Sequence, residues 1–225
     1  MIKRYAAGIV AGLAWLLAPA DARADLMYAF GQADYVVDPG ATVDVQVFLR
    51  EVVGAGETSI LATDGLFGAG VRVTFAGAEP AVVAAESDVA GAPGFNLAPP
   101  VVDLVAGASA GLAQSVDFLD PDARVLGTPD GADVFTILLG TFRFTAGSLA
   151  GGVTNLTAID FAPGGSSDTI TAGSNPIVLD GLIAAGSATI TVRRDPSAVP
   201  EPASLALLAG GLAAVAAVAR RRRAG

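Results

Sequence analysis

The sequence predicts an all-β fold, a single β-sandwich placed between two terminal segments that do not belong to it. In the middle of the chain, apolar residues alternate with polar ones at a period of two, as they do on strands with one buried face. The intervals between these runs are rich in Gly, Pro, Asp and Ser, which turns require. No segment of the middle shows a long amphipathic helix, and many short strands with such punctuation indicate two packed sheets.

The N-terminal segment has the organisation of a secretory signal peptide. Its positive start, its apolar stretch and its small-residue cleavage site are Lys3 and Arg4, Ala6 to Ala18, and Ala22-Arg23-Ala24. We therefore expect signal peptidase to remove residues 1–24, so that the mature chain begins at Asp25. An uncleaved N-terminal anchor is the alternative, because Trp15, Leu16 and Leu17 are strongly apolar.

Residues 25–195 carry the alternating runs and form the predicted sandwich domain. The expected strands are Thr42 to Leu49, Val71 to Phe75, Val82 to Ala85, Phe135 to Phe144 and Ala188 to Val192. The first run places Val43, Val45, Val47 and Leu49 on one face. Gly140 is the expected site of a β-bulge within its run. The remaining stretches are interpreted as a short turn over Leu112 to Leu119 and a flexible loop over Gly164 to Ser174.

Three stretches of this domain resemble the cohesin-type jelly-roll sandwich. They are the strand after Asp38-Pro39-Gly40, the run ending in Val71-Arg72-Val73-Thr74-Phe75, and Leu139 to Gly147 followed by Val153 to Thr157. The resemblance spans most of residues 26–192 and implies the fold but not the partner, since nothing identifies a dockerin-recognition surface. The chain departs from the family in Ala85 to Gly111, which is longer and richer in Ala, Gly and Pro than a compact sandwich loop.

The C-terminal segment, residues 196–225, has three parts in a fixed order. They are the motif Val199-Pro200-Glu201-Pro202-Ala203-Ser204, an apolar stretch over 203–219, and the arginines Arg220, Arg221, Arg222 and Arg223. As a helix, the apolar stretch would be roughly 26 Å long against a hydrocarbon core of about 30 Å, so it can just span a bilayer. Arginine is costly in the bilayer, so the arginine cluster should stay cytoplasmic and the Pro-Glu-Pro motif should be exported.

This order of motif, helix and arginines resembles the PEP-CTERM sorting signal. The resemblance implies export, transient retention in the inner membrane, and cleavage by an exosortase near Val199, Pro200, Glu201 and Pro202, followed by delivery to the cell surface. The alternative is a permanent C-terminal anchor with an incidental Pro-Glu-Pro.

Charge and cysteine content limit what the exported domain can do. From Asp25 to Pro200 there are 6 arginines, no lysine and 20 acidic residues, a net charge of −14 where the whole chain carries −9. Such a surface repels nucleic acid and anionic headgroups, stays soluble, and could attract cations or basic partners. The chain has no cysteine, so its stability must come from a packed core, which this length can supply.

The residue types that are missing exclude most enzyme chemistry. The chain has no histidine and no cysteine, and the domain has no lysine, which removes a Ser-His-Asp triad, a thiol nucleophile, a Schiff-base lysine and ordinary zinc ligation. Paired carboxylates could still serve a glycosidase, but such enzymes need a sugar cleft, usually lined by aromatic residues, and these are scarce here. We therefore predict a protein that is not an enzyme and has no organic cofactor.

Four acids around turns form a candidate calcium site: Asp120, Asp122, Asp130 and Asp133. Carboxylate oxygens are ligands that calcium prefers, although the full pattern of an EF-hand loop is absent. The alternative is that these are solvated turn residues.

Two functions remain. The first is a non-enzymatic cell-surface or extracellular-matrix protein that an exosortase processes, associated with exopolysaccharide or a surface protein. The alternative is a specific protein- or glycan-binding module of cohesin-like type that depends on calcium. An exported carboxylate-based hydrolase is a third hypothesis, kept because polysaccharide substrates occur in that compartment.

Overall fold

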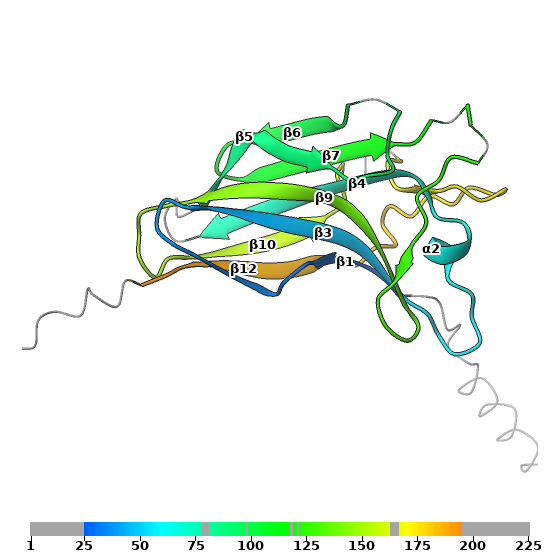
Figure 1. Ribbon diagram of the computed structural model, residues 1–225, viewed down its shortest axis with the longest axis horizontal. Helices are drawn as coiled ribbons and strands as arrows, with labels where there is room; N and C mark the ends of the chain where they lie inside the picture. The colour runs from blue at the N-terminus through cyan, green and yellow to red at the C-terminus, as the bar shows by residue number, and fades with distance from the viewer. Residues whose placement is uncertain are drawn as a thin grey trace, which may run out of the picture.

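The computed structural model describes residues 25–77, 82–97, 99–117, 119–120, 122–162 and 167–194. These residues form two β-sheets and one short helix, which confirms the predicted all-β, sandwich-like fold (Figure 1). The predicted signal peptide and the predicted C-terminal segment lie outside the described residues. Within the part of the chain that is described, no helix is both long and apolar enough to cross a bilayer.

The strands divide between the sheets as follows. The first sheet contains β1 (Asp25–Phe30), β3 (Thr42–Val52), β5 (Val82–Gly91), β8 (Thr128–Pro129) and β9 (Val134–Ala146), in the order β1-β3-β9-β5 with β8 also on β9. The second contains β2 (Asp34–Val37), β4 (Leu66–Gly77), β6 (Val101–Val105), β7 (Ser109–Ser115), β10 (Val153–Ile159), β11 (Ile170–Thr171) and β12 (Gly186–Val192), in the order β2-β12-β10-β4-β7-β6 with β11 also on β4. These pairs are antiparallel except that of β2 with β12, which is parallel.

One hydrophobic core takes side chains from both sheets. The alternation predicted for β3 is confirmed, because Val45, Val47 and Leu49 are fully buried. Phe75 of β4 and Phe144 of β9 meet edge to face, with ring centroids 5.5 Å apart, and so join the two sheets across the core. Burying each large apolar side chain contributes about 1.5–3 kcal/mol, so this core can hold the domain together without disulfides.

The bulge expected at Gly140 is confirmed. Val47 lies opposite Gly140 while Phe48 lies opposite Leu138, so β9 carries one extra residue at this point. A Cβ atom on Gly140 would collide with the side chain of Leu112 and would lie 3.0 Å from the carbonyl oxygen of Ala90. Glycine is therefore required here because β9 bends tightly against its neighbours.

Two expectations about the middle of the chain are wrong. The short turn expected over Leu112 to Leu119 is largely strand β7, and the long loop expected over Ala85 to Gly111 contains the end of β5, all of β6 and the start of β7. Strand β7 is built mostly from small residues, which carry a weak alternation signal, whereas β6 is a short apolar run whose valines are exposed. The small residues have a packing reason, because a Cβ atom on Gly111 would lie 2.8 Å from the ring of Phe161.

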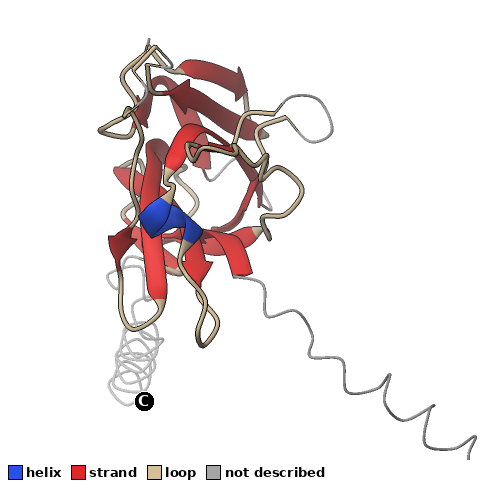
Figure 2. Cartoon of the chain, turned by 90° about the vertical axis from the view of Figure 1, so that its right-hand side faces the viewer, coloured by secondary structure: helices blue, strands red, loops and turns tan. Residues whose placement is uncertain are grey.

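The helix α2 (Ile60–Thr63) is held by a buried carboxylate. Ser59 caps the helix, since its hydroxyl accepts from the amide of Ala62 at 2.9 Å. Glu51, fully buried at the end of β3, accepts from the Ser59 hydroxyl at 2.6 Å and from the amides of Ile60 and Leu61, each at 2.9 Å. The helix is only one turn long, so these hydrogen bonds, rather than helix propensity, fix its position. Figure 2 looks onto the end of the sandwich that carries this helix.

Candidate functional site

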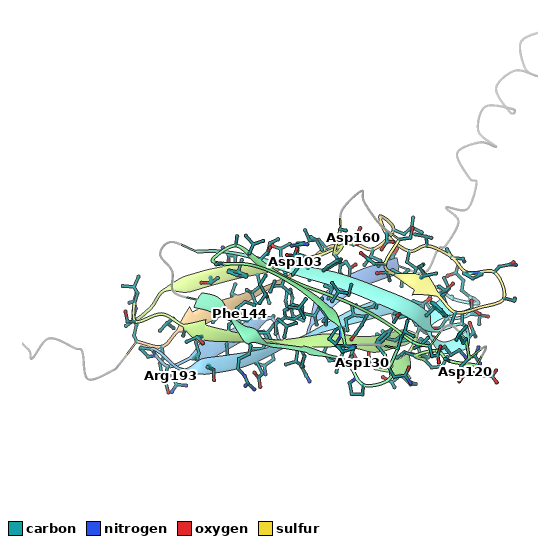
Figure 3. All side chains as sticks on the ribbon, turned by 90° about the horizontal axis from the view of Figure 1, so that it is seen from above. Asp103, Asp120, Asp130, Phe144, Asp160 and Arg193 are labelled. Carbon is teal, nitrogen blue, oxygen red and sulfur yellow. The ribbon has the colours of Figure 1, made fainter. Side chains whose placement is uncertain are left out.

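The last described residues, which follow β12, lie at the end of the sandwich opposite α2 (Figure 1). The amide of Arg193, just after β12, donates to the carbonyl of Val37 at 2.7 Å, and its guanidinium lies 3.1 Å from the carboxylate of Asp38. Both side chains are more than half exposed, so this ion pair adds little stability. Figure 3 shows Arg193 and Asp120 at opposite ends of the molecule. The predicted sorting segment therefore begins next to the end that is formed by Arg193.

The predicted sorting residues lie outside the described residues. This holds for Val199, Pro200, Glu201 and Pro202 of the motif and for the arginine cluster Arg220 to Arg223. Their roles stay predictions from the sequence.

Among the described residues, the four predicted calcium ligands are not part of a metal-binding group. Asp120 and Asp122 lie in the connection between β7 and β8, and Asp130 and Asp133 lie in the turn between β8 and β9. All four side chains are exposed, and one Asp120 oxygen accepts from the amide of Asp122 at 3.0 Å. Among the described residues, none of the four belongs to a group of three acids whose oxygens could share a metal ion. A calcium site made of these residues stays a prediction.

Three other aspartates do come together, and we call them the aspartate cluster: Asp160, Asp168 and Asp180. One carboxylate oxygen from each lies within 4.8 Å of the others. Strand β4 brings two of them together. Asp160 comes directly after β10, which pairs with β4 at Arg72. Asp168 comes just before β11, which pairs with β4 at Gly68. Asp180 enters from the turn that follows the buried Leu179.

Hydrogen bonding within the aspartate cluster is incomplete. The two oxygens of Asp180 accept from the amides of Asp168 and Thr169, at 3.0 and 3.1 Å. Among the residues that the structure describes, none donates a hydrogen bond to the buried Oδ1 of Asp160 or Oδ2 of Asp168. The only other such side-chain atom among the described residues is Oγ1 of Thr154. Buried carboxylate oxygens without a partner are costly, so two of them in one place require a physical explanation.

The surrounding strands leave space for the cluster. A Cβ atom on Gly70 of β4 would lie 2.5 Å from Cγ of Asp168 and 2.8 Å from Cβ of Phe161, so only glycine fits. Arg72, two residues further along β4, holds Phe161 in place by donating from Nε to its carbonyl at 2.9 Å, with its guanidinium carbon 5.3 Å from the ring centroid. Asp160 is thereby fixed through the residue that follows it.

Burial and mutual repulsion raise the pKa values of Asp160 and Asp168 in the cluster. Burial, with the charges of Asp180 and Asp160, raises the pKa of Asp168 to about 7. Burial and the Asp180 charge also raise the pKa of Asp160. The phenol of Tyr28, which donates to the carbonyl of Gly70 at 3.2 Å, has its pKa raised mainly by burial and next by the charge of Asp160. The cluster is therefore a place where negative charge is concentrated and poorly compensated.

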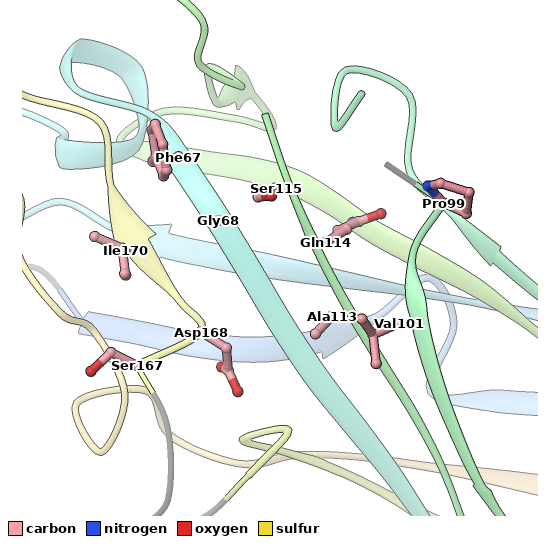
Figure 4. Close-up of a pocket in the computed structure, with 10 residues that line it drawn as sticks. All are labelled: Phe67, Gly68, Pro99, Val101, Ala113, Gln114, Ser115, Ser167, Asp168 and Ile170. Carbon is pink, nitrogen blue, oxygen red and sulfur yellow. The ribbon is translucent and has the colours of Figure 1, made fainter. Parts of the chain in front are cut away.

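Asp168 also borders a pocket of about 340 Å³ that opens between β6, β7 and β11 (Figure 4). The pocket is lined by Phe67, Gly68, Pro99, Val101, Ala113, Gln114, Ser115, Ser167, Asp168 and Ile170. Solutes can thus reach the edge of the cluster. Three carboxylates are suited to a hard cation such as calcium, whose ligands are oxygen atoms.

The aspartate cluster was not predictable from local sequence. Its members are 8 and 12 residues apart and match no metal-binding spacing. Part of the intervening chain belongs to the stretch interpreted as a flexible loop, Gly164 to Ser174, but Ile170 and Thr171 form β11 and Thr169 and Thr171 are fully buried. The flexible-loop interpretation is therefore wrong for these residues.

Comparison with known proteins bears on the tail and on the fold. Residues 198–223 match the model of the PEP-CTERM protein-sorting motif. No curated protein matches the chain.

Several solved structures are similar to the chain at low sequence identity. CaCohA2 from Clostridium acetobutylicum, a cohesin domain, is 14% identical over 75% of this chain and 92% of its own, with a TM-score of 0.43. BcpA, the major pilin subunit of Bacillus cereus, is 8% identical over 76% and 40%, with a TM-score of 0.32. The N-terminal domain of the Streptococcus gordonii adhesin Sgo0707 is 12% identical over 76% and 33%, with a TM-score of 0.29.

The motif match covers the part of the chain for which the sequence predicted a sorting signal, and it begins four positions after Arg194, the last described residue. The chain therefore carries a PEP-CTERM sorting motif, which implies an exosortase substrate that is exported, held at the membrane and then sorted to the surface.

Proposed function

We propose that this protein is a non-enzymatic component of the cell surface or extracellular matrix, associated with exopolysaccharide after an exosortase has removed its C-terminal segment. The observation that carries the proposal is the sorting motif at residues 198–223. The acidic, cysteine-free domain supports it, because such a domain stays soluble outside the cell and needs no disulfide to fold.

The position of the tail on the domain supports the same proposal. Only a few residues separate Arg194 from the matched motif, so the membrane-held protein keeps the Arg193 end of the sandwich close to the bilayer. The opposite end, which carries Asp120, then faces away from the membrane (Figure 3). The loops at that end are available to partners before and after cleavage.

The proposal is tested in cells by changing the motif alone. Replacing Pro200, Glu201 and Pro202 by alanine should leave the protein uncut in the inner membrane, because the exosortase loses its recognition sequence while the helix and arginines stay. Deleting the exosortase should have the same effect on the unaltered protein. Cell fractionation followed by immunoblotting measures size and location, with Asp120→Asn as a control that should be processed normally. Normal cutting and surface delivery of the alanine variant would contradict the proposal.

A specific surface feature favours a second candidate function, glycan binding. The outer face of the first sheet carries a pocket of about 460 Å³ lined by Ala29, Phe30, Gly31, Gln46, Phe48, Arg50, Asp130 and Thr136. A neighbouring pocket of about 420 Å³ shares Gly31 and Gln46 with it. The rings, amide and hydroxyl of this lining suit contact with a sugar, and Arg50 is the group that suits a carboxylate substituent, despite Asp130 beside it and the acidic domain around it.

Arg50 is the residue that makes this candidate testable. Among the partners described for it, the guanidinium donates to the sulfur of Met27 at 3.6 Å and to no carboxylate. Arg50→Ala should reduce retention on an immobilised acidic polysaccharide such as alginate by about tenfold, since one charge-assisted hydrogen bond contributes about 1.5 kcal/mol or more. Arg124→Ala, which removes an exposed arginine elsewhere, is the matched control. Equal retention of both variants and the unaltered protein would exclude this site.

A further inference from the structure

The aspartate cluster needs a positive partner that the described protein groups do not supply. Its three carboxylates lie on three short segments, each fixed by a different contact: the end of β10 by Arg72 and Phe161, the start of β11 by pairing with β4, and Asp180 by two amides. No arginine is paired with any of the three, among the ion pairs described. The arrangement therefore concentrates like charges and keeps them fixed.

The two buried oxygens without partners show where that positive group belongs. Oδ1 of Asp160 and Oδ2 of Asp168 are shielded from solvent, so water does not satisfy them as it satisfies an exposed carboxylate. A carboxylate elsewhere in the same fold shows the contrast, since Glu51 is fully buried and accepts three hydrogen bonds. The fold therefore supplies hydrogen-bond donors to Glu51, whereas the described residues supply none to these two oxygens.

We propose that Asp160, Asp168 and Asp180 together bind one calcium ion. Calcium takes six to eight oxygen ligands in flexible geometry, and three carboxylates supply up to six oxygens with their negative charge. The oxygens of Asp180 keep a free lone pair after accepting one amide each. Magnesium demands a stricter octahedron and gives up its waters reluctantly, so it fits a crowded three-carboxylate site less well.

The neighbouring pocket supplies the entry path. Asp168 and Ser167 line its wall, so a cation can reach the cluster from this side, and water can complete the coordination shell there (Figure 4). Because Gly70 has no side chain, β4 packs closely against Asp168 without displacing its carboxylate from the pocket wall.

A bound calcium ion would fasten residues 160–180 to the second sheet. Among the described residues of this stretch, the short strand β11 pairs with β4, and single hydrogen bonds, such as that from the Ala172 amide to the Gly65 carbonyl at 3.2 Å, add to that pairing. Extracellular calcium is in the range that sites of this kind bind, about 10⁻⁴ to 10⁻³ M, so the segment would become fixed after export. The inference does not depend on the sorting motif, and either can fail without the other.

The test measures thermal unfolding of the full chain in mild detergent, with EDTA and with 2 mM calcium or magnesium. Calcium should raise Tm by about 5 °C, and magnesium should raise it less. Asp168→Asn and Asp160→Asn should each abolish the calcium shift. The double variant Asp120→Asn/Asp130→Asn is the control and should keep it, although it removes two negative charges, because both of these acids are exposed and outside the cluster.

Three outcomes would overturn the proposal. They are no calcium shift in the unaltered protein, a full shift in Asp168→Asn, or a shift lost in the Asp120→Asn/Asp130→Asn control, which would place the ion at the four exposed acids instead. A second readout applies even if the Asn variants unfold, because Tyr28 lies beside the cluster and should sensitise the luminescence of terbium, a calcium substitute. Tyr28→Phe should remove most of this emission while leaving the calcium shift of Tm in place. Full emission from Tyr28→Phe would show that terbium binds elsewhere and would contradict the site.

Discussion

Glu51 is fully buried and the aspartate cluster is partly buried in the same sandwich, and the fold surrounds these acidic groups in opposite ways. Glu51 accepts hydrogen bonds from the Ser59 hydroxyl and two amides at the start of α2. In the aspartate cluster, three carboxyl groups face one another, and two of their oxygens have no hydrogen-bond partner among the described residues. The comparison separates a carboxylate whose hydrogen bonds stabilise the fold from carboxyl groups that the described residues leave partly unpaired, a difference that shielding from solvent alone does not reveal.

The largest loss of stability is expected on replacing Glu51, the buried carboxylate that accepts three hydrogen bonds. Glu51→Ala should lower the free energy of unfolding by about 4 kcal/mol, because it leaves three buried donors without an acceptor and opens a cavity. Urea unfolding of the full chain in detergent measures this, and the loss should be the same with and without calcium. Glu57→Ala is the control, since the exposed Glu57 accepts a single long hydrogen bond from Gly54 at 3.3 Å and its loss should cost less than about 0.5 kcal/mol. Equal costs for the two variants would mean that the Glu51 contacts do not stabilise the fold.

The next effect is expected beneath the aspartate cluster. Gly70→Ala should cost about 2 kcal/mol, because the added methyl group overlaps Asp168 and Phe161 in closely packed surroundings. Gly31→Ala should be nearly neutral, since the nearest atom to its new Cβ would be 3.5 Å away. Thermal unfolding in EDTA compares the two. A neutral Gly70→Ala would show that the contact between β4 and Asp168 is loose.

A smaller change in the free energy of unfolding is expected from pH. Its direction distinguishes Asp168 from a carboxylate whose pKa is lowered in the folded state. The pKa of Asp168 is raised to about 7, so the folded state binds its proton more tightly than the unfolded state. In EDTA, this group should make the free energy of unfolding fall as pH rises from about 4 to about 7. Asp44 acts in the opposite direction and at lower pH, because a hydrogen bond from Arg143 lowers its pKa. Comparing the unaltered protein with Asp168→Asn isolates the effect, since the variant should show a flatter dependence. Identical pH profiles would mean that Asp168 is an ordinary solvated acid.

The smallest effect is expected at the four exposed acids, Asp120, Asp122, Asp130 and Asp133. Replacing Asp120 or Asp122 by alanine should change the free energy of unfolding by less than about 0.5 kcal/mol, because their side chains are surrounded by solvent. Urea unfolding with and without calcium measures this. A calcium-dependent loss in either variant would restore these acids as the metal ligands.

The sequence predicted the parts of the fold that follow from strong local patterns. The run from Thr42 to Leu49 became the core of β3, and the glycine at 140 became the bulge in β9, because alternation and an isolated glycine are local signals. Strand β7 was missed because its small residues alternate weakly, and Gly111 among them packs closely against Phe161. Strand β6 was missed because its five residues, Val101 to Val105, show no alternation of apolar and polar positions.

The candidate site depends on long-range contacts and was not predictable in the same way. Asp160 and Asp168 meet only because β10 and β11 both pair with β4, a fact of topology that spacing does not encode. The four acids around turns were singled out because they are close in sequence, yet the structure leaves them exposed and in no group of three. For a metal site made from separate loops, closeness in sequence is a poor guide to closeness in space.

The central claim is that the chain is exported and cut at its C-terminal motif, and the mass of the mature protein tests it most directly. Protein recovered from the cell surface or medium should begin at Asp25 and lack the segment that follows the Pro200-Glu201-Pro202 motif, which intact-mass spectrometry would show as one species shortened at both ends. Recovery of the full 225-residue mass, with its arginine cluster still attached, would contradict the account.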